Sequence, residues 1–233
     1  MKSWVVDGPA RWRVQRGHLS DSDEPILVID DFSEQPDAWV KFAATRPFRK
    51  LAPYYPGVRS EVSQDYLKLH LPPLLPLVAD VFGCSAGVRP TECFFSMVTD
   101  RPETLAPLQR MPHIDGGGDD KLALLHYLCH ENQGGTAFYR HRSSGRSRIP
   151  AAEFGAYETA LERDVAAHGL PVAAYPRGSS ELFEKTGACP AAYNRAVIYR
   201  GINLHAIDIP ADFDFDPRPG HGRLTINTFL LPA

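Results

Sequence analysis

The sequence predicts a mainly β domain of the sandwich or barrel type, preceded by a smaller α/β region. From about residue 88 the chain consists of short β-rich runs separated by Gly, Pro and Asp clusters, and these runs are VRPTECFFSMV, KLALLHYLC, GGTAFYR, RAVIYRG and RLTINTFLL. The 233 residues, 43% of them hydrophobic, are enough to bury one full core. We therefore expect a single domain over residues 1–233, with its β core at 88–233.

Residues 1–87 are expected to form an α/β region that supports this core. PILVIDDF at 25–32 is a β-branched run closed by acids, which predicts a strand. Ser33 then offers an N-cap for a helix that starts near Pro36. The next residues are rich in Pro, Tyr and Gly, and three prolines follow, so a loop and then a short helix, LLPLVADVFG at 74–83, are predicted.

One segment within the β core has helical spacing. IPAAEFGAYETALERDVAAHG repeats large apolar residues at Phe154, Tyr157 and Leu161 and ends at Gly169. A helical insertion is therefore predicted at about 150–169.

Two loops carry charge of one sign. The loop Arg140–Arg148 contains four arginines and no acid, and Asp208–Asp216 contains four aspartates and no base. Solvated surface loops explain both patterns, and the alternative is that the loops face each other or the substrate entrance.

Composition and the distribution of charge restrict the class of function. The net charge of −3 gives no general attraction to nucleic acid or to an anionic membrane. The start, MKSWVVDGPARW, lacks the apolar core of a secretory signal, and no later run approaches the roughly 20 apolar residues of a membrane span. The cysteines form no C-x-x-C pair, so we expect reduced thiols and a cytoplasmic protein that binds neither nucleic acid nor membrane.

A metal site is predicted from three residues. In an extended segment, side chains two positions apart share a face, so His113 and Asp115 can reach one ion. His205 follows the strand-like RAVIYRG and would complete a facial triad of two histidines and one carboxylate. Such a triad leaves positions open for small ligands, which suits iron(II) better than a closed structural zinc site. Asp119 and Asp120 are alternative carboxylates, although the strand argument favours Asp115.

An anion-binding site is predicted at the head of the last β-run. Arg223 and Thr225 are two positions apart and therefore share one side of a strand. A buried guanidinium beside a hydroxyl can hold one carboxylate of a dicarboxylate bidentately, with an additional hydrogen bond. Taken alone, Arg223 is more simply explained as a surface arginine, but together with the triad we favour the binding role.

The order and rough spacing of these motifs resemble those of the iron(II)/2-oxoglutarate oxygenases, most of all the prolyl-hydroxylase-like branch. The matching motifs, in order, are His113-x-Asp115, LALLHYL, GGTAFY, His205 and Arg223-x-Thr225. The resemblance covers residues 88–232 and implies a double-stranded β-helix, a jelly-roll or cupin-like barrel with the metal ligands at its mouth.

The resemblance also implies cofactors and a reaction. Iron(II) would be held by His113, Asp115 and His205, with 2-oxoglutarate and dioxygen as co-substrates and hydroxylation of a small-molecule or peptide C–H bond as the outcome. Tyr127 would hydrogen-bond the distal carboxylate of 2-oxoglutarate, and by strand alternation its neighbour His126 would face the other side. Because halogenating relatives lack the carboxylate ligand, the aspartate favours hydroxylation or desaturation.

Several alternatives stay open. The gap between His205 and Arg223 is long and acidic, and His221 within it is a competing site residue. A non-catalytic cupin-like metal- or ligand-binding protein is the main rival, followed by a metal-dependent hydrolase or isomerase. Tyr54, Tyr55, Arg59 and the 140–148 loop are candidates for a substrate entrance that favours an acidic molecule, although surface loops explain them equally well. We also allow for a homodimer.

Overall fold

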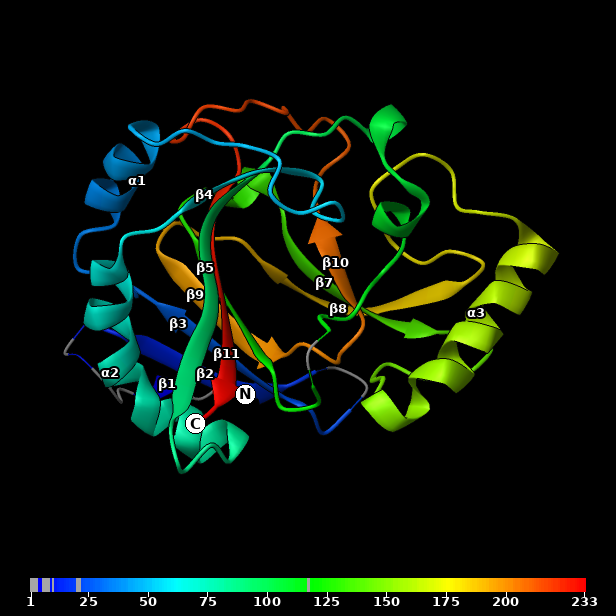
Figure 1. Cartoon of the computed structure of the whole chain (residues 1–233), viewed down its shortest axis with the longest axis horizontal. Helices are drawn as coiled ribbons and strands as arrows, with labels where there is room; N and C mark the ends of the chain where they lie inside the picture. Colours follow the sequence, from blue (N-terminus) through cyan, green and yellow to red (C-terminus); the bar gives the residue numbers. More distant parts are fainter. Residues whose placement is uncertain (1–3, 6–8, 10, 20–21, 117) are drawn as a thin grey trace.

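The protein consists of two antiparallel β-sheets with helices at its flanks (Figure 1). The structure is a computed structural model that describes residues 4–5, 9, 11–19, 22–116 and 118–233. Over these residues the strands form an eight-stranded sheet in the order β1-β2-β3-β9-β6-β11-β5-β4 and a three-stranded sheet in the order β10-β7-β8. The mainly β class predicted from the sequence is therefore confirmed, and the two-sheet arrangement is consistent with a jelly roll.

The strands have the following bounds: β1 Trp4–Val5, β2 Arg13–His18, β3 Pro25–Asp30, β4 Gly57–Glu61, β5 Val88–Val98, β6 Leu122–Tyr127, β7 Gly135–His141, β8 Phe183–Pro190, β9 Arg195–Arg200, β10 His205–Asp208 and β11 Leu224–Pro232. The helices are α1 Pro36–Ala44, α2 Gln64–Phe82 and α3 Phe154–His168. Short 3-10 turns lie at Pro102–Thr104, Pro107–Arg110, Glu131–Gln133 and Ala151–Glu153.

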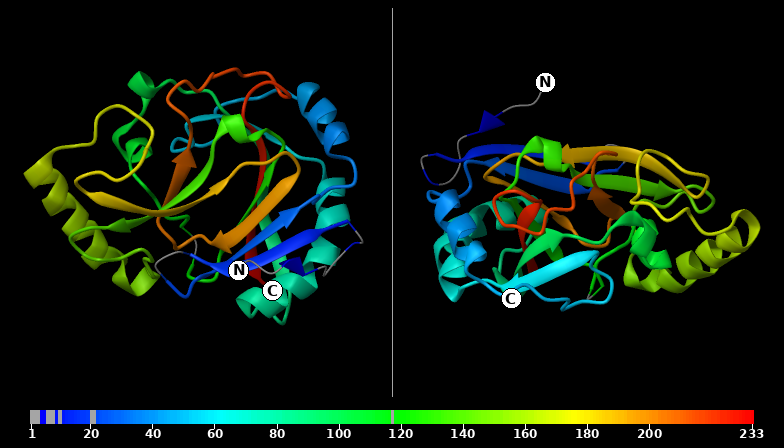
Figure 2. Two further views of the ribbon diagram at one scale, coloured as in Figure 1. Left: turned by 180° about the vertical axis from the view of Figure 1, so that it is seen from behind. Right: turned by 90° about the horizontal axis from the view of Figure 1, so that it is seen from above.

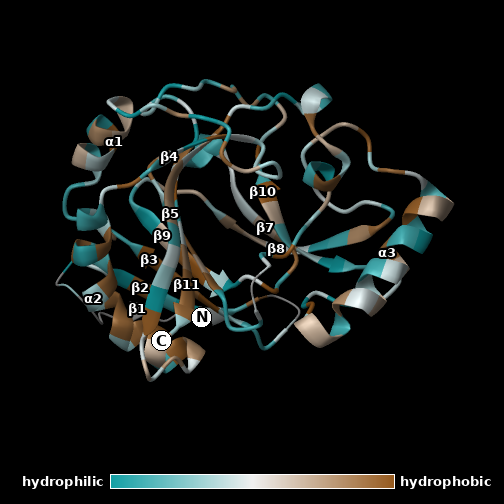
Figure 3. Ribbon diagram, in the orientation of Figure 1, coloured by the Kyte–Doolittle hydropathy of each residue, from teal (hydrophilic) through white to brown (hydrophobic). Residues whose placement is uncertain are grey.

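Strand alternation divides the eight-stranded sheet into an outer and an inner face. On β6, Leu122 and Leu124 point outward into a hydrophobic core shared with α1 and α2, whereas Ala123 and Tyr127 point inward toward the three-stranded sheet. Figure 2 shows α1 and α2 against one side of the large sheet, and α3 at the far end of the molecule. Figure 3 shows that hydrophobic residues concentrate on α2 and the central strands. The inner face is the one available to a site between the sheets.

His126 confirms the predicted alternation. It is buried on the outer face, where Tyr66 Oη lies 3.0 Å from its Nδ1 and Asn194 Oδ1 lies 3.1 Å from its Nε2. Burial, together with the nearby His70, lowers the pKa of His126 to about 3, so its ring is neutral at pH 7. It is therefore a structural histidine of the core.

Two predictions for the N-terminal region were wrong. The helix around the prolines begins at Gln64 and not near residue 74, because the Ser63 side chain caps it by accepting from Asp65 N. Pro72 and Pro76 face solvent, while Tyr66 and Leu74 pack into the outer core, and this packing offsets the cost of internal prolines.

The other wrong prediction was the cap of α1. Gln35, and not Ser33, occupies the N-cap position. The Ser33 hydroxyl instead accepts a hydrogen bond from Gln35 N at 3.3 Å, so it stabilises the turn that precedes the helix.

The helical spacing at about 150–169 corresponds to α3. Among the helices that the structure describes, none is both long enough and apolar enough to cross a bilayer. The prediction that the chain lacks a secretory signal depends partly on residues 1–3, 6–8 and 10, which lie outside the described residues.

Candidate metal centre and co-substrate site

Backbone pairing brings His113, Asp115 and His205 together. His113 and His205 form an isolated antiparallel bridge in which each N–H donates to the other's carbonyl at 2.9 Å. Two residues further on, Asp115 N donates to Gly201 O at 2.7 Å. A Cβ atom at position 201 would lie 2.8 Å from Asp115 Cβ, so glycine is required for the carboxylate to sit there.

The three side chains present their ligand atoms to one point. One ligand atom from each of His113, Asp115 and His205 lies within 4.8 Å of the other two. His205 Nδ1 lies 2.8 Å from the Asn203 carbonyl and donates to it, which leaves Nε2 as the free lone pair, 3.6 Å from Asp115 Oδ2. The predicted triad therefore converges, and its role as a metal site stays a prediction.

The protonation states suit a cation. Burial lowers the pKa of His205 to about 4. Crowding at the site and the neighbouring His205 also lower the pKa of His113, although His113 is an exposed residue. Both rings are neutral near pH 7, which is the form that binds metal. Burial raises the pKa of Asp115, and its Oδ2 has no hydrogen-bond partner among the described residues. A bound cation would supply that missing partner.

The alternative site residues lie elsewhere. Asp119 accepts a hydrogen bond from Ala151 N at 2.7 Å, so its carboxylate caps the turn before α3. Asp120 and His221 are exposed, and neither belongs to the cluster that the described residues form. The structure therefore favours Asp115 as the carboxylate of this site.

The inner face of the large sheet carries a row of polar side chains beside this cluster. Arg59 on β4 pairs with Ser96 on β5, Ser96 pairs with Thr225 on β11, and Thr225 pairs with Tyr127 on β6. Directly paired residues of neighbouring antiparallel strands share a face. Four strands therefore place a guanidinium, two aliphatic hydroxyls and a phenol in one line.

Arg223 lies at the head of β11, and its side chain is almost fully buried. Its Nη2 donates to Gly135 O on β7 at 2.9 Å, and its guanidinium carbon lies 5.5 Å from the centre of the Tyr127 ring. Nε is buried without a hydrogen-bond partner, and no carboxylate in the described part of the chain forms an ion pair with this arginine. A buried cation in this state is costly unless a ligand anion compensates it.

The predicted hydroxyl partners of Arg223 are engaged with other groups. The Tyr127 hydroxyl lies 2.7 Å from Thr136 Oγ1, and the Thr225 hydroxyl donates to Asn227 Oδ1 at 2.6 Å. Their roles toward a carboxylate stay predictions.

Two other hydroxyls lie here: Tyr55, which the sequence suggested only as part of a substrate entrance, and Ser96, which sequence reasoning missed. Tyr55 Oη and Ser96 Oγ are both buried, and neither makes a well-formed hydrogen bond to a described residue. Burial raises the pKa of Tyr55, while the charge of Arg223 lowers it, followed by Arg59 and the Ser96 hydroxyl. The phenol therefore lies within electrostatic reach of both arginines. Only the strand register shows that Ser96 lies opposite Thr225.

One hollow of the described surface lies away from this cluster. Its volume is about 710 Å³, and it lies between the Glu131–Gln133 turn and the acidic loop, with Lys185, Asp208, Asp212 and Phe213 in its lining. It includes none of the triad residues and not Arg223. We therefore assign chemistry to the inner face and not to this hollow.

A family model described as "Family of unknown function (DUF6445)" matches residues 10–230. The chain belongs to this family. No curated protein matches its sequence.

Solved structures show what the fold of this DUF6445 chain resembles. HygX from Streptomyces hygroscopicus with nickel and 2-oxoglutarate bound is 12% identical, covers 89% of this chain and 83% of its own, and has a TM-score of 0.52. HygX has also been crystallised with iron bound. The likeness shows a shared fold, and the predicted iron and 2-oxoglutarate agree with what the HygX crystals hold.

Two further structures are similar at lower scores. SnoN, a non-heme alpha-ketoglutarate-dependent epimerase from nogalamycin biosynthesis, is 9% identical, covers 90% of this chain and 78% of its own, and has a TM-score of 0.47. AviO1 from Streptomyces viridochromogenes Tue57 is 13% identical, covers 96% and 89% of the two chains, and has a TM-score of 0.43.

Proposed function

We propose that this protein is a non-haem iron(II) enzyme that uses 2-oxoglutarate and dioxygen, with His113, Asp115 and His205 as metal ligands. The observation that carries the proposal is a pair of unsatisfied groups. Asp115 Oδ2 is buried without a hydrogen-bond partner, and Arg223 is buried without an acidic partner, among the residues described. A metal ion and a dicarboxylate that chelates it would satisfy both groups.

The fold of the proposed enzyme is a double-stranded β-helix formed by one domain over residues 1–233. The likeness to HygX and the hydrophobic cluster enclosed between the two sheets support this proposal. Membership of the prolyl-hydroxylase-like branch and a cytoplasmic location belong to the same proposal. The proposal also includes a small-molecule or peptide substrate, the absence of nucleic-acid and membrane partners, and a homodimeric assembly.

The chain prepares its metal ligands in two ways. The Asn203 carbonyl fixes the tautomer of His205 so that Nε2 faces Asp115. The backbone bridge between His113 and His205 fixes the spacing of the two rings, whose centroids lie 4.4 Å apart. Tyr199 packs edge-on against His205 at 5.0 Å and shields the ring from water.

Arg223 would hold the distal carboxylate of 2-oxoglutarate through Nε and the free hydrogens of its guanidinium. Tyr55 Oη and Ser96 Oγ on the inner face have no well-formed hydrogen bond to a described residue, so they join the predicted Thr225 and Tyr127 as candidates for this carboxylate. The bond from Arg223 to Gly135 O holds the guanidinium in place before the co-substrate arrives.

Iron(II) with 2-oxoglutarate and dioxygen supplies the oxidation of a C–H bond, with release of succinate and carbon dioxide. The chain contributes position and a water-poor surface, because Tyr127, Phe138 and Tyr199 between the sheets are nearly fully buried. We propose hydroxylation as the reaction. Epimerisation is the second outcome to examine, because SnoN has that activity and a similar chain path.

Anaerobic titration with iron(II) and 2-oxoglutarate tests the proposal. We expect the weak visible charge-transfer band of the chelate in the wild-type protein, followed by succinate formation when air is admitted. Metal binding without the band or succinate would support the rival, a non-catalytic cupin-like binding protein. Turnover of a substrate without succinate would support a metal-dependent hydrolase or isomerase.

A further inference from the structure

Arg59 is a cation near the proposed site, and it has no acidic partner among the described residues. Its guanidinium carbon lies 4.3 Å from the centre of the Tyr55 ring and 5.7 Å from that of Phe94. Its Nε is buried without a hydrogen-bond partner, and no described carboxylate lies within ion-pair distance of it. Aromatic packing holds this group in place, and its hydrogen-bond donors remain available.

The position of Arg59 connects it with the reaction centre. Through the strand register it shares the inner face with Ser96 and Thr225. Thr225 pairs in turn with Tyr127, whose ring lies 5.5 Å from the guanidinium carbon of Arg223. Arg59 therefore belongs to the same row of side chains between the sheets as the proposed co-substrate site.

Arg59 is also held rigidly. Its β4 backbone pairs with Arg49 on one side and with Ser96 on the other. The Tyr55 ring under the guanidinium belongs to a buried cluster, whose other members are Val98, Leu105, Tyr175, Ile209 and Phe213. A preorganised guanidinium loses little entropy when it binds an anion.

The arginines of the 140–148 loop differ in this respect, because every one of them already has a partner. Arg140 pairs with Glu184, Arg142 donates to Ser180 O, Arg146 pairs with Glu153, and Arg148 pairs with Glu24. That loop is therefore a structural element, and Arg59 is the better candidate for contact with an anionic substrate.

The sum of the charges at the site also indicates that Arg59 contacts an anion. This argument rests on the proposed function. The charges of iron(II), Asp115, 2-oxoglutarate and Arg223 cancel one another when the two histidines are neutral. Lys121 and Glu92, the other charges that act on Asp115, are of opposite sign, so Arg59 carries the remaining positive charge. A second anion beside the metal would restore neutrality.

We propose that Arg59 binds a carboxylate of the primary substrate, so that the substrate class is carboxylic acids, either small molecules or peptides with an acidic group. The planar guanidinium fork, with Nε free, matches a carboxylate bidentately. Arg59 would then determine specificity by fixing which carbon of the acid lies next to the metal.

Ligand-observed NMR with matched probes tests this assignment. The protein is loaded with zinc in place of iron and with saturating 2-oxoglutarate, so that Arg223 is occupied. Benzoate, benzamide and phenyl phosphate are then compared. We expect benzoate to bind at least about 10-fold more tightly than benzamide, which is the range for a charge-assisted bidentate contact.

Variants connect the signal to one side chain. Arg59→Gln should remove the preference for benzoate, and Arg59→Lys, which keeps the charge but not the fork, should retain part of it. Arg46→Gln is the matched control, because the exposed Arg46 also stacks on an aromatic ring, Phe42, on the opposite side of the large sheet.

The outcomes separate this inference from the proposed function. Equal binding of benzoate and benzamide, tighter binding of phenyl phosphate, or benzoate binding that survives Arg59→Gln would each overturn the carboxylate assignment. A raised 2-oxoglutarate requirement in Arg59→Gln with the preference for benzoate intact would place Arg59 in the co-substrate site and also overturn it. If benzoate binding depends on Arg59 but iron and 2-oxoglutarate give no chelate band, the proposed function fails and the carboxylate site stands.

Discussion

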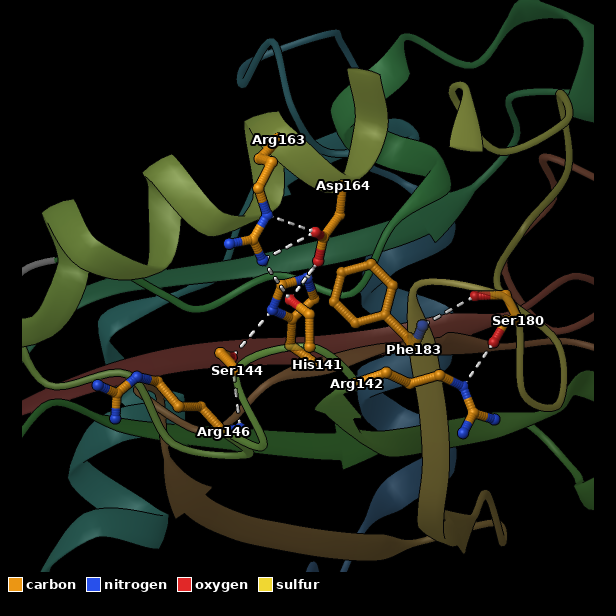
Figure 4. A network of polar contacts seen from close by, with 9 residues as sticks. His141, Arg142, Ser144, Arg146, Arg163, Asp164, Ser180 and Phe183 are labelled. Atoms are coloured by element: carbon orange, nitrogen blue, oxygen red, sulfur yellow. Dashed lines mark hydrogen bonds and ion pairs between the residues drawn. The ribbon is translucent and has the colours of Figure 1, made fainter. Parts of the chain in front are cut away.

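Two clusters of polar side chains in this protein differ in how their charges are compensated. At α3, the Asp164 carboxylate accepts from Arg163 Nη2 at 3.0 Å and lies 3.3 Å from His141 Nε2, and His141 Nδ1 lies 2.9 Å from Ser144 Oγ (Figure 4). At the inner face, Asp115 Oδ2 and the Nε atoms of Arg59 and Arg223 are buried without a partner in the described chain. Both clusters contain arginine, aspartate and histidine, so residue type alone does not distinguish them.

The difference separates a structural cluster from the proposed binding site. Paired charges at α3 connect the inserted helix to β7. The Asp164 carboxylate accepts from Arg163 and Ser143 and lies beside His141, so its charge is compensated within the chain, although His141 Nε2 makes no well-formed hydrogen bond. Unpaired groups at the inner face are costly in the empty protein, and the proposed metal ion and dicarboxylate would satisfy them. Breaking the first cluster should therefore reduce stability, and breaking the second should reduce binding.

The largest expected effect is that of Asp115→Ala. This change removes the only carboxylate of the triad, so iron-dependent succinate formation should fall below detection. The metal-free variant should unfold at the same temperature as the wild type or at a higher one, because the lost oxygen was buried without a hydrogen-bond partner. Asp119→Ala is the control and should keep activity. Loss of activity in Asp119→Ala alone would mean that the carboxylate ligand has been misassigned.

The next effect concerns Arg223→Ala. Loss of a charge-assisted bidentate contact, about 3 kcal/mol, should raise the apparent 2-oxoglutarate requirement by a factor on the order of 10². Iron affinity should change little, and titration of the chelate band measures both quantities. Arg142→Ala, which removes a charge from the paired loop, should leave the requirement unchanged. An unaltered requirement in Arg223→Ala would favour the non-catalytic binding protein.

Asp164→Ala should show the opposite pattern. It leaves the buried His141 ring nitrogen and the Arg163 guanidinium without their partner, and we expect a loss of about 1–3 kcal/mol in the free energy of unfolding. Urea denaturation measures this loss, and formation of the chelate band should be unaffected. A stable variant with weak 2-oxoglutarate binding would show that the two clusters are coupled.

The smallest expected effect is a change in the free energy of unfolding for each unit of pH. The folded-state pKa of His126 is about 3, below the unfolded value of about 6.5, so the unfolded chain takes up the proton first. The stability that a neutral His126 contributes is complete above pH 6.5 and is lost as the pH falls toward 3. Each such histidine contributes up to about 1.4 kcal/mol per pH unit. Urea denaturation of the metal-free protein should show this slope, which His126→Asn should flatten and the exposed His168→Asn should not.

Sequence reasoning succeeded where one local period decided the structure. Alternation predicted that His113 and Asp115 share one face of their segment, and that His126 points away from the face that carries Tyr127. Both predictions depend only on the two-residue repeat of a strand. It failed at α2, because tertiary packing of Tyr66 and Leu74 outweighed the signal of three prolines.

Features that depend on strand pairing could not be predicted from the sequence. Ser96 becomes a neighbour of Thr225, and Arg59 a neighbour of Ser96, only when β4, β5 and β11 are aligned, since these residues are far apart in the chain. The pairing of the arginines in the 140–148 loop likewise depends on acids from distant segments. Such contacts follow from topology, which local patterns do not encode.

The bridge between His113 and His205 has a consequence for dynamics. The two residues are each other's hydrogen-bond partners through their backbones, so an ion held by their side chains would join the same two segments a second time. Opening of this bridge and release of the ion would then be one event. The amide hydrogens of His113 and His205 should exchange with deuterium slowly in the zinc-loaded protein and quickly in the metal-free protein, whereas the amides of β6 and β9 should exchange equally slowly in both.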